Sequence, residues 1–120
     1  MLAYKLFGGG ANTLVTAAIC DGVTGLTATG TNQSTALALT NGVNGITTVS
    51  AGTGVILDGQ ARSGDSQVVY NGGANSLKVY PPSGAAINGL AVNTGVSLAT
   101  GTACEYHCLS TTQWVAILSA

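Results

Sequence analysis

The chain has 120 residues, which is enough for one domain core and too short for two. Charged residues make up only 6% of it, against about 25% in an average soluble domain, and its formal net charge is −1. Two lysines and one arginine (Lys5, Lys78 and Arg62) cannot neutralise a run of phosphates, so this composition excludes nucleic acid and an anionic membrane surface as partners. So few charges leave little repulsion between copies, and we expect other protein to cover much of the surface.

The first ten residues are predicted to form an arm. A short, largely apolar segment (Tyr4, Lys5, Leu6 and Phe7) is followed by three glycines (8–10). Glycine adopts both signs of φ at little steric cost, so we expect a hinge between the arm (1–10) and a single domain (11–120). The arm is predicted to bind a partner by adding a strand to its sheet; the alternative is an edge strand of the domain itself. We expect no signal peptide, since the initial apolar stretch contains a lysine.

Short runs rich in Val, Ile, Thr and aromatic residues follow along the whole chain, separated by Asp-Gly and Asn-Gly pairs that are typical of tight turns. The predicted strands are 14–20, 45–50, 54–57, 66–71, 76–80, 96–99, 104–110 and 113–118. The predicted turns are Asp21-Gly22, Asn41-Gly42, Asn44-Gly45, Asp58-Gly59, Asn71-Gly72 and Asn88-Gly89. This spacing predicts an all-β fold, a sandwich or a barrel, with little or no helix. The window 33–39 is the best helical one, and it is short enough to be one turn or a strand.

Alternation assigns faces to the last two strands. In 104–110, Cys104, Tyr106 and Cys108 share one face, and Glu105 and His107 share the other, so the first three are predicted to be buried. The final strand, QWVAIL, is apolar on both faces, as expected for a central strand or for one covered by a neighbouring subunit. Its tryptophan, Trp114, is predicted to be a core or subunit-interface anchor.

The cysteines and the histidine are the only candidates for metal binding. A structural zinc site needs four converging ligands, whereas His107 projects away from the two cysteines of its strand. Cys104 and Cys108 lie about 13 Å apart on an extended strand, too far for a disulfide. With Cys20 as the third cysteine, the prediction is buried, reduced thiols and no metal or cofactor.

Catalytic residues are equally sparse. Ser66 follows Gly64 and Asp65, but a nucleophilic serine needs an oriented histidine base, and His107 is the only histidine. The glycine pattern of a nucleophile elbow is missing too. Carboxylate pairs for glycoside hydrolysis would have to come from Asp21, Asp58, Asp65 and Glu105, of which the aspartates stand next to glycine in turn contexts. The sequence therefore predicts no enzymatic activity.

The C-terminal half resembles a known pattern. Its elements are NGGANSLKVYP (71–81), INGL (87–90), SLATGT (97–102) and STTQW (110–114), within residues 64–118. This pattern resembles that of small structural proteins of tailed-phage virions, namely capsid cement or decoration proteins and modules of tail fibres. The resemblance implies a jelly-roll-like β-sandwich that is a homo-oligomer, trimer or dimer.

The resemblance also implies a function and a location. The protein would be made in the bacterial cytoplasm and would bind the outer surface of the phage capsid, where it would bridge neighbouring major capsid subunits. The alternative is a receptor-binding head domain of a tail fibre or spike. A free carbohydrate-binding lectin is a third interpretation, which the lack of clustered aromatic residues disfavours.

Overall fold

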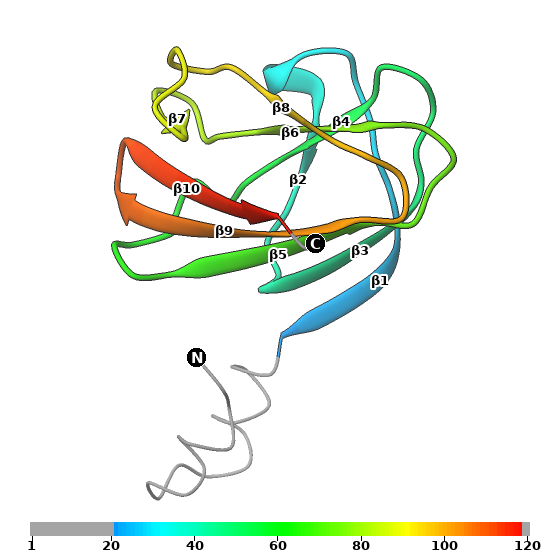
Figure 1. Ribbon diagram of the computed structural model, residues 1–120, viewed down its shortest axis with the longest axis horizontal. Helices are drawn as coiled ribbons and strands as arrows, with labels where there is room; N and C mark the ends of the chain where they lie inside the picture. The colour runs from blue at the N-terminus through cyan, green and yellow to red at the C-terminus, as the bar shows by residue number, and fades with distance from the viewer. Residues whose placement is uncertain (1–20, 119–120) are drawn as a thin grey trace, which may run out of the picture.

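The computed structural model describes residues 21–118 (Figure 1). The elements in chain order are β1 (Gly22–Thr27), the 3₁₀ helix η1 (Gln33–Thr35), β2 (Leu37–Ala38), β3 (Val43–Thr48), β4 (Gly54–Ile56), β5 (Ser66–Asn71), β6 (Leu77–Tyr80), β7 (Ala86–Ile87), β8 (Val96–Leu98), β9 (Ala103–Ser110) and β10 (Gln113–Leu118). The predicted all-β class is confirmed for this range. No helix within it is long and apolar enough to cross a membrane.

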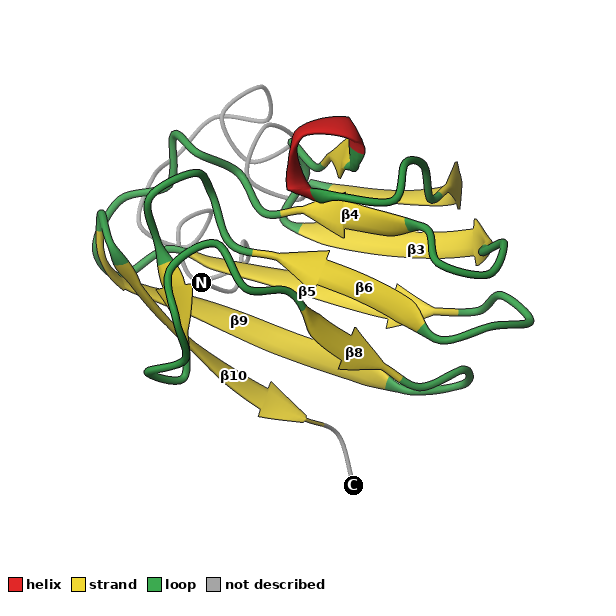
Figure 2. Cartoon of the chain, turned by 90° about the horizontal axis from the view of Figure 1, so that it is seen from above, coloured by secondary structure: helices red, strands yellow, loops and turns green. Residues whose placement is uncertain are grey.

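The strands form two sheets that face each other (Figures 1 and 2). Sheet A has the order β1-β3-β5-β9-β10-β7, and sheet B has the order β2-β4-β6-β8. In the first part of the chain, each strand of sheet A is followed by a strand of sheet B, so β1–β2, β3–β4 and β5–β6 are three successive coils. Equivalent strands of successive coils pair in parallel: β1 with β3, β3 with β5, β2 with β4 and β4 with β6. This arrangement is solenoid-like.

The expectation of a jelly-roll-like sandwich is therefore wrong in its topology, although two sheets do enclose the core. In a jelly roll, neighbouring strands run antiparallel. Here the chain crosses to the opposite sheet after every strand of the coils. When it returns to the first sheet, the next strand runs in the same direction as the previous strand of that sheet, so the two strands pair in parallel. Apart from an isolated bridge between Thr29 and Gly54, antiparallel pairing begins with β8 and β9, which run back along β6 and β5 as a reversed fourth coil. The strand β10 pairs with β9, and the short β7 pairs with β10.

The bounds of the predicted strands agree closely with the observed ones, but β1 and β7 were not predicted. The predictions 66–71 and 113–118 coincide with β5 and β10, and the other predicted strands in the described range begin and end within two residues of the observed ones. The window 33–39 contains both possibilities considered for it, a single helical turn and a strand. The strand predicted at 14–20 lies outside the described residues.

Two predicted turns are wrong: Gly22 of Asp21-Gly22 begins β1, and Asn44-Gly45 lies inside β3. The glycine is needed there for a contact between coils, because a β-carbon at Gly45 would lie 2.8 Å from Oγ1 of Thr24 on β1. The strand β1 itself is irregular: its register with β3 shifts on both sides of Leu26, next to Gly25 with φ +79°. These are features of β-bulges, in which an added residue bends the strand.

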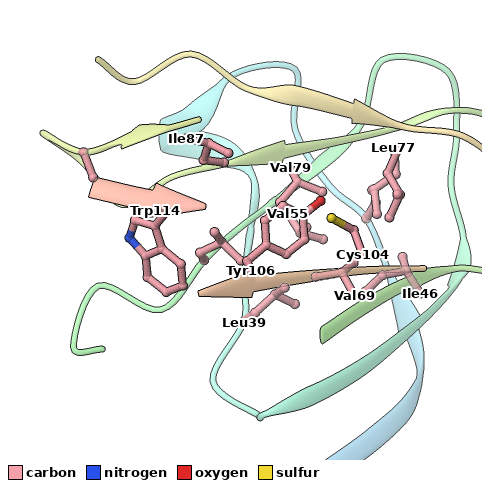
Figure 3. Close-up of a cluster of buried hydrophobic side chains, with 14 of the residues drawn as sticks. Leu39, Ile46, Val55, Val69, Leu77, Val79, Ile87, Cys104, Tyr106 and Trp114 are labelled. Carbon is pink, nitrogen blue, oxygen red and sulfur yellow. The ribbon is translucent and has the colours of Figure 1, made fainter. Parts of the chain in front are cut away.

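The core lies between the sheets (Figure 3). Inward-facing side chains of sheet A contribute Ile46, Val69, Cys104, Tyr106 and Trp114, and those of sheet B contribute Val55, Leu77, Val79 and Leu98. Such alternation of inward and outward residues along each strand is what the period of two dictates.

Three buried amide side chains hold the corners where the chain changes sheet. Gln67 accepts a hydrogen bond from the backbone N–H of Asp58 (2.9 Å) and donates to the carbonyls of Leu39 and Asn41 (3.4 and 3.0 Å). Asn71 donates to two carbonyls and accepts from the N–H of Gly73. The third, Asn44, donates to two carbonyls, while its Oδ1 has no hydrogen-bond partner. These amides satisfy backbone groups that would otherwise be buried unpaired.

Candidate interaction surfaces

The cysteine strand has the predicted orientation. Cys104, Tyr106 and Cys108 are buried, and Cys104 and Cys108 are free thiols. Burial raises the pKa of each of these two thiols and that of the Tyr106 phenol. Thiols that are buried and resist ionisation are weak nucleophiles and weak metal ligands. Trp114 is 2% exposed and packs in the core.

The register brings three chemically interesting residues together on the outer face of sheet A. Ser66 on β5 is directly opposite His107 on β9, and Nε2 of His107 lies 3.3 Å from Oε1 of Glu105. Within the described residues, however, no hydrogen bond joins the Ser66 hydroxyl to the imidazole, and both members of the ion pair are partly exposed. Activation of a serine requires that hydrogen bond and a shielded base, so this grouping lacks the geometry of a catalytic triad.

All four carboxylates of the chain line one cavity of about 830 Å³: Asp21, Asp58, Asp65 and Glu105. Two of them cap local turns, as predicted, since Asp58 accepts from the N–H of Gln60 and Asp65 accepts from the N–H of Arg62. Asp21 accepts from the side-chain amide of Asn41. In the part of the chain that the structure describes, no three His, Cys, Asp or Glu side chains are placed to share a metal ion.

The outer face of sheet A carries apolar side chains on β3, β5 and β10, around Glu105 on β9. Val43, Val68, Glu105 and Ile117 are successive partners on β3, β5, β9 and β10 and form one row across the sheet. Outward-pointing Tyr70 lies on one side of this row, and His107 and Val115 lie on the other. Val43, Tyr70 and Ile117 are 53%, 46% and 56% exposed. Large apolar side chains gathered on one face mark contact sites in soluble proteins.

A second apolar surface is the loop of residues 88–94 between β7 and β8, which we call the Leu90 loop. Leu90 and Val92 are 47% and 57% exposed at its tip. Asn88 and Asn93 have φ of +54° and +66°, and they are the only non-glycine residues with positive φ in the described range. Such conformations are unfavourable for most residues and persist where the surrounding contacts fix them.

The contacts that fix the Leu90 loop come from the two asparagines. Oδ1 of Asn88 accepts a hydrogen bond from the N–H of Ala116 (2.9 Å), and the backbone N–H of Asn88 donates to Trp114. Oδ1 of Asn93 accepts from the N–H of Gly84 (2.7 Å) and from the side chain of Gln33 (3.1 Å). The loop is thus held at both ends while its apolar tip points away from the core.

Sequence reasoning did not single out either surface. The turn 87–90 was part of the resemblance, and the two-sided apolar character of QWVAIL indicated a covered strand, but neither pointed to Val92 or to the row across β3, β5, β9 and β10. The arm residues Tyr4, Lys5, Leu6 and Phe7 lie outside the described residues. Comparison of the chain with family models, curated proteins and solved structures gave no match.

Proposed function

We propose that the protein is a structural component of a phage virion, a cement protein that binds the outside of the capsid and bridges neighbouring major capsid subunits. The observation that carries this proposal is the Leu90 loop, in which two exposed apolar side chains are held in a fixed position by side-chain hydrogen bonds. A preformed apolar tip binds protein with little loss of conformational entropy, because the loop is ordered before it binds.

Two further observations support this proposal. The sequence pattern that resembles small virion proteins lies in residues 64–118, which include the Leu90 loop. The low charge content leaves hydroxyl, amide and apolar groups to make contacts, as suits a surface covered by other protein. The proposal includes a homo-oligomer and no enzymatic activity, metal or cofactor.

The mechanism that we propose is multivalent clamping. An oligomer whose copies each hold one capsid subunit gains affinity through effective concentration, even where each contact is weak. Because such a clamp binds the assembled lattice and not free subunits, mass action shifts the equilibrium towards the intact capsid. The arm, Tyr4–Phe7, is proposed as a second attachment point, in which the strand pairs with capsid protein.

The test is binding of the purified protein to undecorated capsids of the phage that encodes it. Saturable co-sedimentation at a fixed ratio to the major capsid protein, together with a higher temperature of capsid disruption, is the expected result. Absence of binding at tens of micromolar protein would contradict the proposal.

The alternative function, a receptor-binding head domain of a tail fibre or spike, is favoured by one observation. Parallel coils extend along a single axis by addition of further coils, which suits an elongated fibre. The two functions differ in target, since a tail-fibre domain would bind whole host cells and would leave undecorated capsids in the supernatant.

A further inference from the structure

A partner could pair with an edge of one of the sheets or pack on a face. The edges of both sheets are poor templates for pairing, since β2 and β7 have two residues each, β8 has three, and β1 is interrupted by its register shifts. Short and bulged edge strands prevent edge-to-edge association. The broad surface that remains is the outer face of sheet A, with its apolar side chains on β3, β5 and β10.

We propose that this face is the contact between two copies of the chain, related by a two-fold axis. The axis lies in the interface, perpendicular to the strands, and passes between the levels of Glu105 and His107. Each β9 then lies across β9 of the second copy in the opposite direction. The inference rests on the part of the proposed function that concerns a homo-oligomer, and not on capsid attachment.

Polar complementarity favours a second copy as the occupant. Glu105 and His107 point out of this face from β9, and Nε2 of His107 lies 3.3 Å from Oε1 of Glu105, so a hydrogen-bond donor and an acceptor stand side by side near its middle. The proposed axis places Glu105 opposite His107 of the second copy, so that opposite groups meet twice. Tyr70 faces the interface from β5. Asp65 precedes that strand, and the two-fold axis places the two copies of Asp65 at opposite ends of the interface, far from each other. A contact with these properties is self-complementary, as a two-fold interface requires.

The area fits a weak dimer. Three strands of six residues and one of eight, with about 3.3 Å per residue and about 4.8 Å between strands, give a face of roughly 400 Å², hence roughly 800 Å² buried in both copies together. That total is smaller than in stable complexes and suits a transient one, so we expect a dimer that dissociates in the micromolar range. The two sheets would pack about 10 Å apart, as in sandwich domains.

Sedimentation velocity of the full chain tests this interface. The wild type should show twice the 11.7 kDa monomer mass at tens of micromolar protein. Val68→Lys, which replaces an apolar residue of this face by a long charged one, should raise the dissociation constant at least about tenfold. The matched control is Ile56→Lys on the outer face of sheet B, which should leave the dimer intact. Circular dichroism checks that both variants are folded.

A charge exchange tests the axis. Glu105→Lys alone brings two basic groups together, and His107→Glu alone brings two carboxylates together, so each should weaken the dimer several-fold. The double variant restores opposite pairs and should restore the dimer. A monomeric wild type would overturn the proposal. So would a folded Val68→Lys variant that remains dimeric but no longer binds capsids, since this result would assign the face to the capsid protein. A wild-type protein that is dimeric but does not bind capsids would contradict only the proposed attachment.

Discussion

Gly73 packs so closely against Val49 that a β-carbon at position 73 would lie 2.6 Å from Cγ2 and 2.8 Å from the backbone nitrogen of Val49. Val49 follows β3 and Gly73 follows β5, so this contact joins the corners of two successive coils. Asn75 reinforces the contact by donating a hydrogen bond from its side chain to the carbonyl of Val49 (2.8 Å). The stacking of the coils therefore depends on the absence of a side chain at one position.

Gly73→Ala should accordingly lower the free energy of unfolding by about 2–3 kcal/mol, because the added methyl group meets backbone that cannot move without disturbing the neighbouring coil. Urea denaturation measures this. The matched control is Gly59→Ala, where a β-carbon would lie 3.8 Å from its nearest neighbour, Cβ of Pro82. That control should change stability by less than about 0.5 kcal/mol. Equal effects of the two substitutions would contradict the close stacking of the coils.

Asn71→Ala should destabilise the fold by about 2–4 kcal/mol. The substitution removes two hydrogen bonds of 2.9 Å, to the carbonyls of Asn75 and Leu98, and one of 3.0 Å from the N–H of Gly73, and it leaves these backbone groups without a partner. Gln60→Ala, at an exposed position, is the control and should be nearly neutral. Thermal unfolding of both variants checks the difference, and a neutral Asn71→Ala would show that the corner does not need its amide.

Alkaline pH should destabilise the protein through its buried thiols and phenol. The pKa values of Cys104, Cys108 and Tyr106 are raised in the folded state, so their neutral forms stabilise it fully below the unfolded-state pKa, about 8.5 for cysteine and about 10 for tyrosine. This contribution is lost as the pH rises through the folded-state values, by at most about 1.4 kcal/mol per pH unit for each group.

The measurement is the free energy of unfolding from pH 7 upwards, with a reducing agent present. Stability should be constant to about pH 8 and should fall above it. Replacement of both Cys104 and Cys108 by Ala should remove the part of the decline that begins before tyrosine titrates, even though the variant is less stable throughout. A decline of the same size in that variant would assign the effect to other groups.

The Leu90 loop should control attachment without controlling stability. Leu90→Ser with Val92→Ser should raise the dissociation constant for capsids at least about tenfold, since each exposed side chain would lose its apolar burial in the complex. The melting temperature should hardly change. Leu90→Met with Val92→Ile is the control, because it keeps the apolar character of both exposed side chains and should bind capsids as the wild type does. Undiminished capsid binding of the double variant would exclude the loop as the contact.

Asn93→Ala tests whether the loop acts through its fixed conformation. The substitution removes the acceptor for Gly84 and Gln33 and places alanine at a positive φ. Capsid affinity should fall several-fold although Leu90 and Val92 are retained. Asn93→Gly, which tolerates the positive φ but lacks the acceptor, should have an intermediate affinity. Wild-type affinity in Asn93→Ala would mean that the loop needs no preorganisation.

The sequence predicts the strands well but not how they pair. Alternation and β-branched composition reflect the burial of one face of a strand, and parallel and antiparallel strands share this requirement. The strand 66–71 could therefore be predicted without knowing which strands pair with it or in which direction. The parallel coils did leave one signal. DGVTGLT (21–27) and NGVNGIT (41–47) are two copies of one motif, and they become β1 and β3 of adjacent coils. Gly22, Gly42 and Gly45 were interpreted as turn residues, which concealed β1 and the repeat.

The apolar surfaces were harder to predict for a different reason. Whether Val43, Val68 and Ile117 form one row depends on the register of three strand pairs, two of which join segments far apart in the chain. The Leu90 loop depends on hydrogen bonds to positions as distant as Gln33. In contrast, the buried face of 104–110 was predictable, because charged residues on one face of a single strand indicate which face is inside.

The most direct test of the proposed function is a cryo-electron microscopy reconstruction of the phage particle that the proposal assigns to this chain. We expect density for a two-sheet, coiled module on the outer surface of the capsid, at the joints between major capsid subunits, with the Leu90 loop against them and sheet A facing a second copy. Density for the module at the tip of the tail, or a capsid surface without it, would contradict the account.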